Sequence, residues 1–480
     1  MSEKLIFEKS SEGRKGFTLP TWNEDFNIDL DNKFLSSAEL DLPEVSEPEI
    51  LRHYVNLSGL NHHVDKGFYP LGSCTMKYNP KINEYAASLE GFAHVHPYQK
   101  TETVQGALEL YYETARLLEE VSGFAKVSLQ PVAGAHGEWT SLKVIRAYHE
   151  KMGNPRKKVI IPDTAHGTNP ASIAMAGYDV VELKSNEEGM VDVAMLREVF
   201  DTETAAFMIT NPNTIGIFER NIKEIAEIVH SKGGLLYMDG ANMNALTGLV
   251  RPAEMGFDVM HFNLHKTFST PHGGGGPGSG PIGVVEKLVE FLPVPDVEKV
   301  TKNGKDFYQF ACSNENTIGK VHSFYGNYGV VVRAYTYLKM LGKEGLRRVS
   351  ENAIINANYI KKSLEKYYHL PYKNHCMHEV VFSGENLLKY GVKTLDVAKR
   401  LLDFGVHAPT IYFPLLVHEA IMIEPTETES KETLDNFIEV MKQIALEAEE
   451  TPEVVKNAPV NTPVKRLNEA LAAKKLEVKA

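Results

Sequence analysis

Apolar residues in the middle of the chain follow two different spacings. Across residues 108–118 and again across 222–229 they recur every three or four positions, which is the spacing of one helical face. Residues 159–161, 205–209 and 235–238 are instead short, continuous apolar runs, as buried strands are. Strands that alternate with amphipathic helices predict an α/β fold with a mostly parallel sheet and helices on both of its faces.

The pattern changes in the last third of the chain. Residues 329–341 and 350–368 predict two long helices. A smaller α/β unit then follows, with a strand at 380–382, a helix at 394–404 and a second strand at 420–423. The sequence therefore predicts a large domain followed by a smaller C-terminal α/β domain.

These patterns divide the chain into four predicted parts. They are an N-terminal arm (1–75), a large domain (76–328), a small C-terminal domain (329–450) and a C-terminal tail (451–480). The arm is irregular, with scattered Pro and acidic residues, and we expect it to wrap a partner subunit or the body of its own chain. The tail has three Pro and many Lys and Ala, which is typical of a surface extension.

Composition narrows the function classes. The 480 residues are 43% hydrophobic, enough for a large core, and the net charge of −12 argues against nucleic acid or an anionic membrane surface as a partner. Only three Cys occur, far apart, which predicts no disulfide framework, no zinc motif and a reducing compartment. We see no secretory signal and no membrane span, and we expect a cytoplasmic protein.

The densest glycine run of the chain follows a lysine. Lys266 and its neighbour His265 precede residues 273–280, where six of eight residues are glycine. Glycine lets a ligand approach the backbone closely, and a lysine can form a Schiff base with a carbonyl when burial or a cationic neighbour lowers its pKa. A surface glycine loop beside a solvated lysine is the alternative interpretation.

A second glycine turn lies at residues 133–138, just before a helical run. Gly134, Ala135 and His136 would place unpaired N–H groups at a helix N-terminus, which is a natural phosphate site. Many glycine turns bind nothing, so this turn alone is weak evidence.

Two further polar residues follow predicted strands. His166 comes after the 159–161 run, among Gly, Thr and Asn, although a lone histidine is more often structural. Asp239 ends the 235–238 run and precedes Asn242. A buried Asp requires a cationic partner, whereas an Asp that caps a helix does not. In such sheets, ligands bind beyond the carboxyl ends of the strands, where all these residues are expected.

In chain order these groups are a phosphate turn, a flat ring, an acid and, 27 residues later, a lysine. That order resembles the fold-type I pyridoxal-phosphate enzymes. The resemblance implies that Lys266 carries pyridoxal 5'-phosphate as a Schiff base, that Asp239 pairs with the protonated ring nitrogen and that His166 stacks on the ring. It also implies that Gly134, Ala135 and His136 hold the phosphate, with His265 reaching it and Asn242 contacting the phenolic oxygen.

Longer motifs narrow the resemblance to one family. They are residues 70–77 (PLGSCTMK), 165–172 (AHGTNPAS), 239–245 (DGANMNA) and 263–283. They resemble the P-protein family of the glycine cleavage system, glycine dehydrogenase (decarboxylating), from about residue 68 to residue 430. Since the single-chain form is about twice as long, this chain resembles the lysine-bearing second subunit of the split bacterial form.

The resemblance implies both a reaction and partners. Glycine would lose its carboxylate as carbon dioxide, and the aminomethyl group would pass to the lipoyl group of the H-protein. The glycine-rich run 268–280 would form a mobile rim for the lipoyl arm. The expected partner is a homologous first subunit without the lysine, in an α2β2 heterotetramer.

Alternatives remain on the same fold and outside it. A cysteine desulfurase, an aminotransferase or another amino-acid decarboxylase would share the motifs, and a non-catalytic scaffold subunit would share the fold. Cys74 is either a reactive thiol or a small buried hydrophobe. We identify no arginine for the substrate carboxylate. The His pairs at 62–63 and 94–96 lack carboxylate partners, so we predict no metal.

Overall fold

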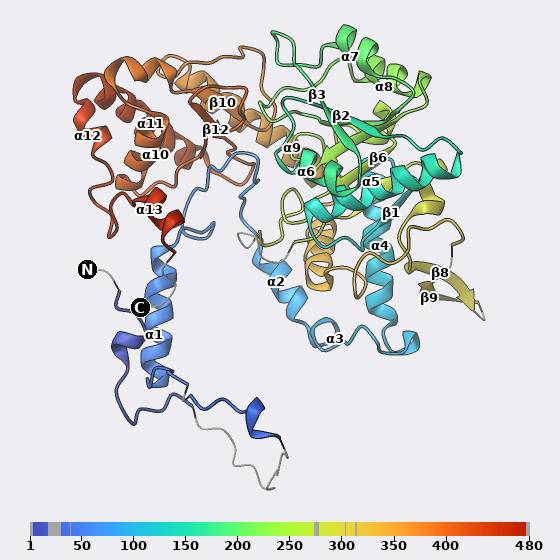
Figure 1. Ribbon diagram of the computed structural model, residues 1–480, viewed down its shortest axis with the longest axis horizontal. Helices are drawn as coiled ribbons and strands as arrows, with labels where there is room; N and C mark the ends of the chain where they lie inside the picture. The colour runs from blue at the N-terminus through green and yellow to red at the C-terminus, as the bar shows by residue number, and fades with distance from the viewer. Residues whose placement is uncertain are drawn as a thin grey trace. The chain divides into compact units, whose positions relative to one another are not determined.

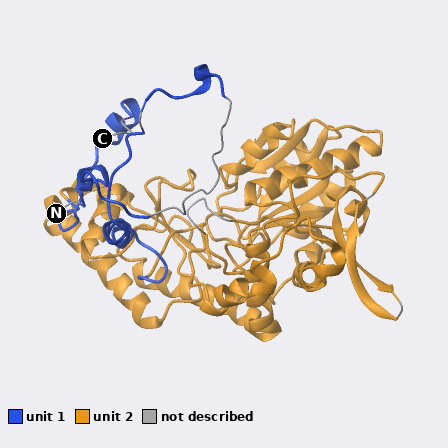
Figure 2. Ribbon diagram, turned by 90° about the horizontal axis from the view of Figure 1, so that it is seen from below, with its two compact units in different colours: residues 1–67, 458–480 blue, residues 68–457 orange. Residues whose placement is uncertain are grey.

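The computed structural model describes residues 3–17, 30–38, 40–272, 278–302, 304–312 and 314–476. Residues 18–29 of the predicted arm and residues 273–277 of the predicted glycine-rich rim lie outside the described residues. The chain forms two compact units, Met1–Gly67 with Ala458–Ala480, and Phe68–Asn457, coloured separately in Figure 2.

The first unit is built around one helix, α1 (Glu47–Leu60). Its start is stabilised by Glu49, which accepts hydrogen bonds from the backbone N–H and the hydroxyl of Ser46. The short helices of this unit are η1 (Phe7–Lys9), η2 (Asn32–Phe34) and α13 (Glu469–Lys474). Large apolar side chains on α1, including Leu51 and Tyr54, are more than half exposed within the described residues.

The core of the second unit is a seven-stranded sheet (Figure 1). Its strands, in spatial order, are β1 (Lys126–Ser128), β7 (Ile282–Val284), β6 (Val259–Phe262), β5 (Leu235–Gly240), β4 (Thr204–Thr210), β2 (Lys158–Pro162) and β3 (Asp179–Leu183). All the pairs are parallel except the two that β7 makes with β1 and β6. The predicted strands at 159–161, 205–209 and 235–238 are the centres of β2, β4 and β5.

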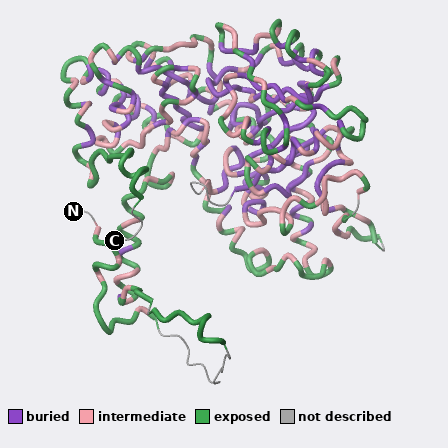
Figure 3. Tube along the Cα trace, in the orientation of Figure 1, coloured by how far each residue is buried: buried purple, intermediate pink, exposed green. Residues whose placement is uncertain are grey.

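Alternate residues of each strand pack into different layers, because successive side chains point to opposite faces. Ile160 packs with helices α4 (Gln105–Ser122), α7 (Val193–Val199) and α8 (Ile222–Ser231). Its neighbours Val159 and Ile161 pack with α5 (Gly134–Lys151) and α6 (Thr168–Met175). Both faces of the sheet are therefore buried, as the continuous apolar runs require. In Figure 3 the trace of these strands is coloured mainly as buried.

Helix α4 ends where the sequence predicts. Gly123 follows its last turn with φ 78°, a left-handed conformation that glycine adopts without strain, and its N–H closes the helix on the Glu119 carbonyl. The predicted helices at 329–341 and 350–368 instead form α9 (Tyr328–Leu364), which is interrupted at Gly342. Gly342 has φ 58° and a non-helical ψ, so it breaks the helical path locally.

A second, three-stranded antiparallel sheet forms the small C-terminal part. Its order is β10 (Val380–Ser383), β12 (Ala420–Ile423) and β11 (Thr410–Ile411). Its core is shared with the end of α9 and with α10 (Thr394–Asp403), α11 (Lys431–Glu450) and α12 (Pro452–Lys456). Val455 of α12 is fully buried in this core, beyond the boundary predicted at 450.

The remaining elements are short. They are α2 (Lys81–Ser88), α3 (Glu90–Ala93), the hairpin of β8 (Asp296–Lys302) and β9 (Lys305–Ala311), and the 3-10 turns η3 (Thr101–Thr103), η4 (Pro252–Met255), η5 (Glu286–Phe291) and η6 (Glu385–Tyr390). In the described part of the chain, no helix combines the length and the apolar character that crossing a bilayer requires.

Candidate active site

The carboxyl ends of three parallel strands of the large sheet, β2, β5 and β6, carry the predicted site residues. His166 lies in the loop after β2, Asp239 ends β5 and Lys266 lies in the turns after β6. Lys266 and Asp239 both interact electrostatically with the imidazole of His166. The fold therefore brings these three residues together from positions 73 and 27 residues apart.

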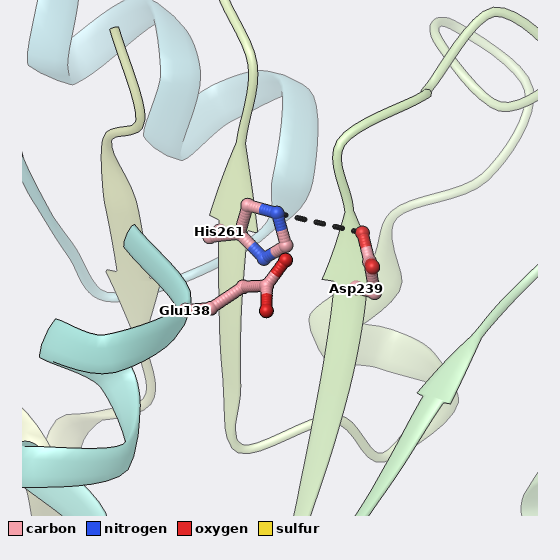
Figure 4. A group of neighbouring side chains, drawn as sticks. All are labelled: Glu138, Asp239 and His261. Atoms are coloured by element: carbon pink, nitrogen blue, oxygen red, sulfur yellow. Dashed lines mark ion pairs between the residues drawn. The ribbon is translucent and has the colours of Figure 1, made fainter. Parts of the chain in front are cut away.

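Asp239 is a buried carboxylate held by three neighbours. Its Oδ2 accepts a hydrogen bond from Asn169 Nδ2 at 2.9 Å, and its Oδ1 accepts one from the Ala241 N–H at 3.0 Å. His261 Nε2 lies 3.4 Å from Oδ1 (Figure 4). Burial alone would raise the pKa of Asp239, but His261 and these hydrogen bonds outweigh it and lower the pKa. Asp239 is therefore ionised, which suits a cationic ligand.

Glu138 joins this group from helix α5 (Figure 4). Glu138, Asp239 and His261 are all buried, and each offers a ligand atom within 4.8 Å of the others. A second such group consists of His378, Glu379 and Glu424. Both groups have residue types that could bind a cation, so the prediction of no metal stays a prediction.

His166 is held as a neutral imidazole with a defined tautomer. Its Nδ1 accepts the backbone N–H of Thr168 at 3.2 Å, so the proton of the neutral ring belongs on Nε2. Burial lowers the pKa of His166, and Lys266 lowers it further, against the opposing effect of Asp239. The Thr168 hydroxyl donates to Glu138 at 2.7 Å. On the small-domain side, the ring of Phe413 meets the imidazole edge-on at 5.6 Å.

The start of helix α5 has the form of an anion site. Its N-cap residue, Ala133, provides no side-chain acceptor for the first N–H groups of the helix. A Cβ on Gly134 would lie 2.6 Å from Oδ1 of Asn263, so only glycine allows this close approach. Within the described residues, Oδ1 of Asn263 is buried and has no hydrogen-bond partner. The unpaired N–H donors of the helix start suit a phosphate group.

The imidazoles near this helix start are also neutral. His136 Nδ1 accepts the Val132 N–H at 3.2 Å, and burial lowers the His136 pKa. His265 Nδ1 accepts the Ser279 N–H at 3.3 Å, and burial, with His272 beside it, lowers the His265 pKa to about 3. Both rings can therefore offer an N–H donor to an anion without carrying a charge.

The amine of Lys266 makes a specific contact. Nζ donates to the backbone carbonyl of Ser73 at 2.8 Å. Asn242, predicted to contact the cofactor, donates from Nδ2 to Thr75 Oγ1 at 2.6 Å and to Glu424 Oε1 at 2.8 Å, and its cofactor contact stays a prediction. Lys266 and Asn242 thus both contact the segment of residues 70–77, which the sequence singled out only as a motif.

Several site residues were missed by the sequence reasoning. Asn169, within the 165–172 motif, could have been found as a polar amide three residues after His166. His261 and Asn263 flank the end of β6 and could have been read as strand-end polar residues. Glu379 and Glu424 gave no local signal, because they lie at the ends of two strands of the small sheet, far along the chain from residues 70–77.

The chain matches two described families. Residues 349–466 match the family "Glycine dehydrogenase, C-terminal domain", and residues 111–275 match "Aminotransferase class-V". Among solved structures, the inhibitor-bound glycine decarboxylase (P-protein) of the glycine cleavage system superposes with a TM-score of 0.73, at 20% identity, over 87% of this chain and 93% of that one. At this identity the superposition shows a shared fold and confirms the predicted fold class.

Full-length relatives carry the stronger evidence. The probable glycine dehydrogenase (decarboxylating) subunit 2 of Chloroherpeton thalassium is 60% identical over 482 residues, covering 100% of this chain and 98% of that protein. The protein of the same name from Chlorobaculum tepidum is 58% identical, covering 100% and 99%. Identity of this extent leaves no part of the chain unmatched, and the chain belongs to the family of the glycine dehydrogenase (decarboxylating) subunit 2.

Proposed function

We propose that this chain is the lysine-bearing catalytic subunit of an enzyme that decarboxylates glycine and passes the aminomethyl group to the lipoyl group of the H-protein. Its cofactor is pyridoxal 5'-phosphate. The observation that carries the proposal is the arrangement of Lys266, the ionised Asp239 and the uncapped start of α5 at one end of the sheet, in a chain of this family.

Each residue has one task in this proposal. Lys266 supplies the amine to which the cofactor aldehyde attaches. Asp239 holds the ring nitrogen in its protonated form, because a buried carboxylate stabilises a neighbouring positive charge. When bound, the pyridinium ring stabilises the electron pair that the departing carboxylate leaves behind. His166 presents a flat, neutral imidazole to the ring.

The phosphate end is assigned to a separate group of residues. Backbone N–H groups of Gly134, Ala135 and His136 bind the phosphate oxygens, and His265 adds a neutral donor. The amide of Asn263 lies against Gly134 at the same end, and its Nδ2 supplies a further donor. For Asn242, its bonds to Thr75 and Glu424 favour a role in fixing the 70–77 segment, with the cofactor contact as a second task.

The proposed assembly follows the names of the relatives. "Subunit 2" implies a partner subunit 1, and we propose an α2β2 heterotetramer that receives the lipoylated H-protein. The thiols of Cys74, Cys312 and Cys376 form no disulfide, which suits a reducing compartment, and we propose the cytoplasm.

The test combines a chemical and a kinetic measurement on the full-length chain with its partner subunit. Borohydride reduction followed by peptide mass spectrometry should place a pyridoxyl group on Lys266. The Lys266→Ala variant should fold, lose that adduct and release no carbon dioxide from carboxyl-labelled glycine. Lys223→Ala, which removes an exposed lysine of α8, serves as the matched control and should behave as the wild type.

Other outcomes point to the alternatives. Turnover close to normal in Lys266→Ala, or an adduct on another lysine, contradicts the assignment. An adduct on Lys266 together with release of alanine from cysteine, and no reaction with glycine, would indicate a desulfurase. A chain that never binds the cofactor would be a scaffold subunit.

A further inference from the structure

Two glutamates of the small domain accept hydrogen bonds from the segment of residues 70–77. Glu379, just before β10, accepts the backbone N–H of Ser73 on Oε2 at 2.8 Å. Glu424, just after β12, accepts the backbone N–H of Thr75 at 3.0 Å and the Thr75 hydroxyl at 2.7 Å. Ser73 and Thr75 both have positive φ, 63° and 52°, which is strained for residues with a Cβ. The two carboxyls therefore maintain an unfavourable backbone conformation.

Ser73 links this arrangement to the catalytic lysine. Its N–H donates to Glu379, and its carbonyl accepts the hydrogen bond from Lys266 Nζ at 2.8 Å. A displacement of Ser73 would therefore move the acceptor that orients the Lys266 amine. In the proposed mechanism, Glu379 and Glu424 would not touch the reacting atoms but would act through the backbone.

The two carboxyls cannot both be charged without a large cost. Glu379 and Glu424 are 2% and 0% exposed, and they belong to one group of ligand atoms that lie within 4.8 Å of one another. Burial, and then the charge of Glu424, raise the pKa of Glu379 well above its ordinary value. Glu424 accepts three hydrogen bonds, the third from Asn242 Nδ2 at 2.8 Å. Two carboxyls this close in a buried site are not both ionised, so the pair retains one proton, and burial favours that proton on Glu379.

We propose that Glu379 and Glu424 are a carboxyl pair that shares one proton and positions Lys266 for reaction through the backbone of Ser73. The positioning role rests on the proposed function of Lys266, whereas the shared proton does not. A pair with one proton supplies one negative charge beside the ammonium of Lys266 and keeps the remaining carboxyl neutral in the buried site.

The other titratable groups around the pair are uncharged. His378 Nε2 lies 3.6 Å from Glu379 Oε1, and burial lowers the pKa of His378, so the ring is neutral. Burial raises the pKa of the Cys74 thiol, and it raises that of Cys376 to about 12. The charges that face Glu379 are thus those of Glu424 and Lys266.

The test measures the pKa of Lys266 in the full-length chain after removal of the cofactor. Trace acetylation with acetic anhydride across a pH series, read by peptide mass spectrometry, reports the unprotonated fraction of Lys266. The proteins compared are the wild type, Glu379→Gln, Glu424→Gln, the double variant and the control Glu219→Gln. Glu219 is also a buried carboxyl that accepts backbone N–H groups, from Val191 and Asn221.

A shared proton predicts a non-additive result. Each single variant keeps one negative charge, since the remaining carboxyl ionises, so the labelling rate at neutral pH should stay within about twofold of the wild type. The double variant loses that charge, the pKa of Lys266 falls, and labelling should accelerate on the order of tenfold, which corresponds to about one pKa unit. The Glu219 control should match the wild type.

Two results would overturn the proposal. If the effects of the single variants add up to that of the double variant, or Glu424→Gln alone equals it, the proton is not shared. If the double variant labels like the wild type, the pair supplies no charge that acts on Lys266, and the shared proton has no effect on the lysine. If the double variant fails to fold, infrared spectroscopy of the wild type and Glu379→Gln replaces it. A shared proton predicts a carboxylic-acid band in the wild type that is absent from Glu379→Gln, and its persistence would contradict the proposal. None of these measurements requires glycine turnover, so a negative result for the carboxyl pair can be distinguished from a failure of the proposed function.

Discussion

Asn169 donates a hydrogen bond from Nδ2 to Oδ2 of Asp239 over 2.9 Å, and both residues are buried. Asn169 lies on the first turn of α6 and Asp239 at the end of β5. The bond fixes one carboxylate oxygen, while the Ala241 N–H and His261 contact the other. A carboxylate held in this way is orientated before any ligand arrives, which reduces the reorganisation that binding requires.

This arrangement predicts a large effect for Asp239→Ala. Loss of one member of a buried charge pair costs ~3–5 kcal/mol, so glycine decarboxylation should fall by roughly two to four powers of ten at ~1.4 kcal/mol per factor of ten. Asp192→Ala is the control, because Asp192 is a helix N-cap that accepts from the Met195 N–H. That variant should lose only about 1 kcal/mol of stability. A loss below tenfold for Asp239→Ala would show that Asp239 does not pair with the ring nitrogen.

Gly134→Ala should weaken cofactor binding without unfolding the chain. The added Cβ would lie 2.6 and 2.7 Å from the amide atoms of Asn263, which must then move away from the phosphate end. We expect the affinity for pyridoxal phosphate to fall roughly 5- to 150-fold, since overpacking costs ~1–3 kcal/mol and ~1.4 kcal/mol is a factor of ten. Absorbance titration with the cofactor measures this affinity.

The matched control for that variant is Gly106→Ala. Gly106 lies in the first turn of α4, and a Cβ there would meet no atom within 4 Å. This variant should bind the cofactor normally. Its free energy of unfolding should rise by about 0.5–1 kcal/mol, so it should unfold at a slightly higher denaturant concentration. Equal cofactor affinity in both variants would show that the start of α5 does not bind the cofactor.

Lys77→Met should destabilise the fold strongly. Lys77 Nζ is buried and bonded to Glu427 Oε1 at 2.7 Å and to the Tyr337 hydroxyl at 3.0 Å. Without Lys77, the Glu427 carboxylate, whose side chain is 9% exposed, loses its cationic partner and keeps hydrogen bonds from Tyr337 and Asn244. The loss should cost about 3 kcal/mol, the lower end of the range for a broken buried pair. Urea unfolding should show this loss, and the double variant with Glu427→Gln should recover part of it. Lys431→Ala, which removes an exposed pair with Asp435, should change stability by less than ~1 kcal/mol.

His149 predicts a pH dependence of stability. Its Nε2 donates to the Ala205 carbonyl at 3.0 Å, and burial lowers its pKa to about 4. The unfolded chain has a histidine pKa of about 6.5, so between these values the unfolded state binds more protons. The free energy of unfolding therefore falls as pH falls through that window, by roughly 2–3 kcal/mol from this residue.

Urea titrations at neutral pH and near the lower pKa check this prediction. His149→Gln keeps a donor for Ala205 but cannot titrate, so its stability should fall less on acidification than that of the wild type. His418→Gln, at an exposed histidine, is the matched control and should change the free energy of unfolding by less than ~0.5 kcal/mol at either pH. Identical slopes for the wild type and His149→Gln would show that His149 titrates normally.

Local patterns were sufficient for most of the secondary structure. The apolar runs at 159–161, 205–209 and 235–238 are the centres of β2, β4 and β5, and Gly123 ends α4 as expected. These features depend on residue spacing and on the conformational preference of one glycine, both of which act over a few positions. Since parallel strands end at the same edge, the sequence also predicted where His166, Asp239 and Lys266 would meet.

The supports of the site depended on the tertiary structure. Glu424 contacts Thr75, 349 residues away, and Glu379 contacts Ser73, 306 residues away. Neither glutamate differs in local pattern from a solvent-exposed one. They support the site only in the folded chain, where the small sheet packs against residues 70–77 and both carboxyls are buried. Burial then decides which group keeps its proton, because the cost of a charge depends on its surroundings and not on its neighbours along the chain.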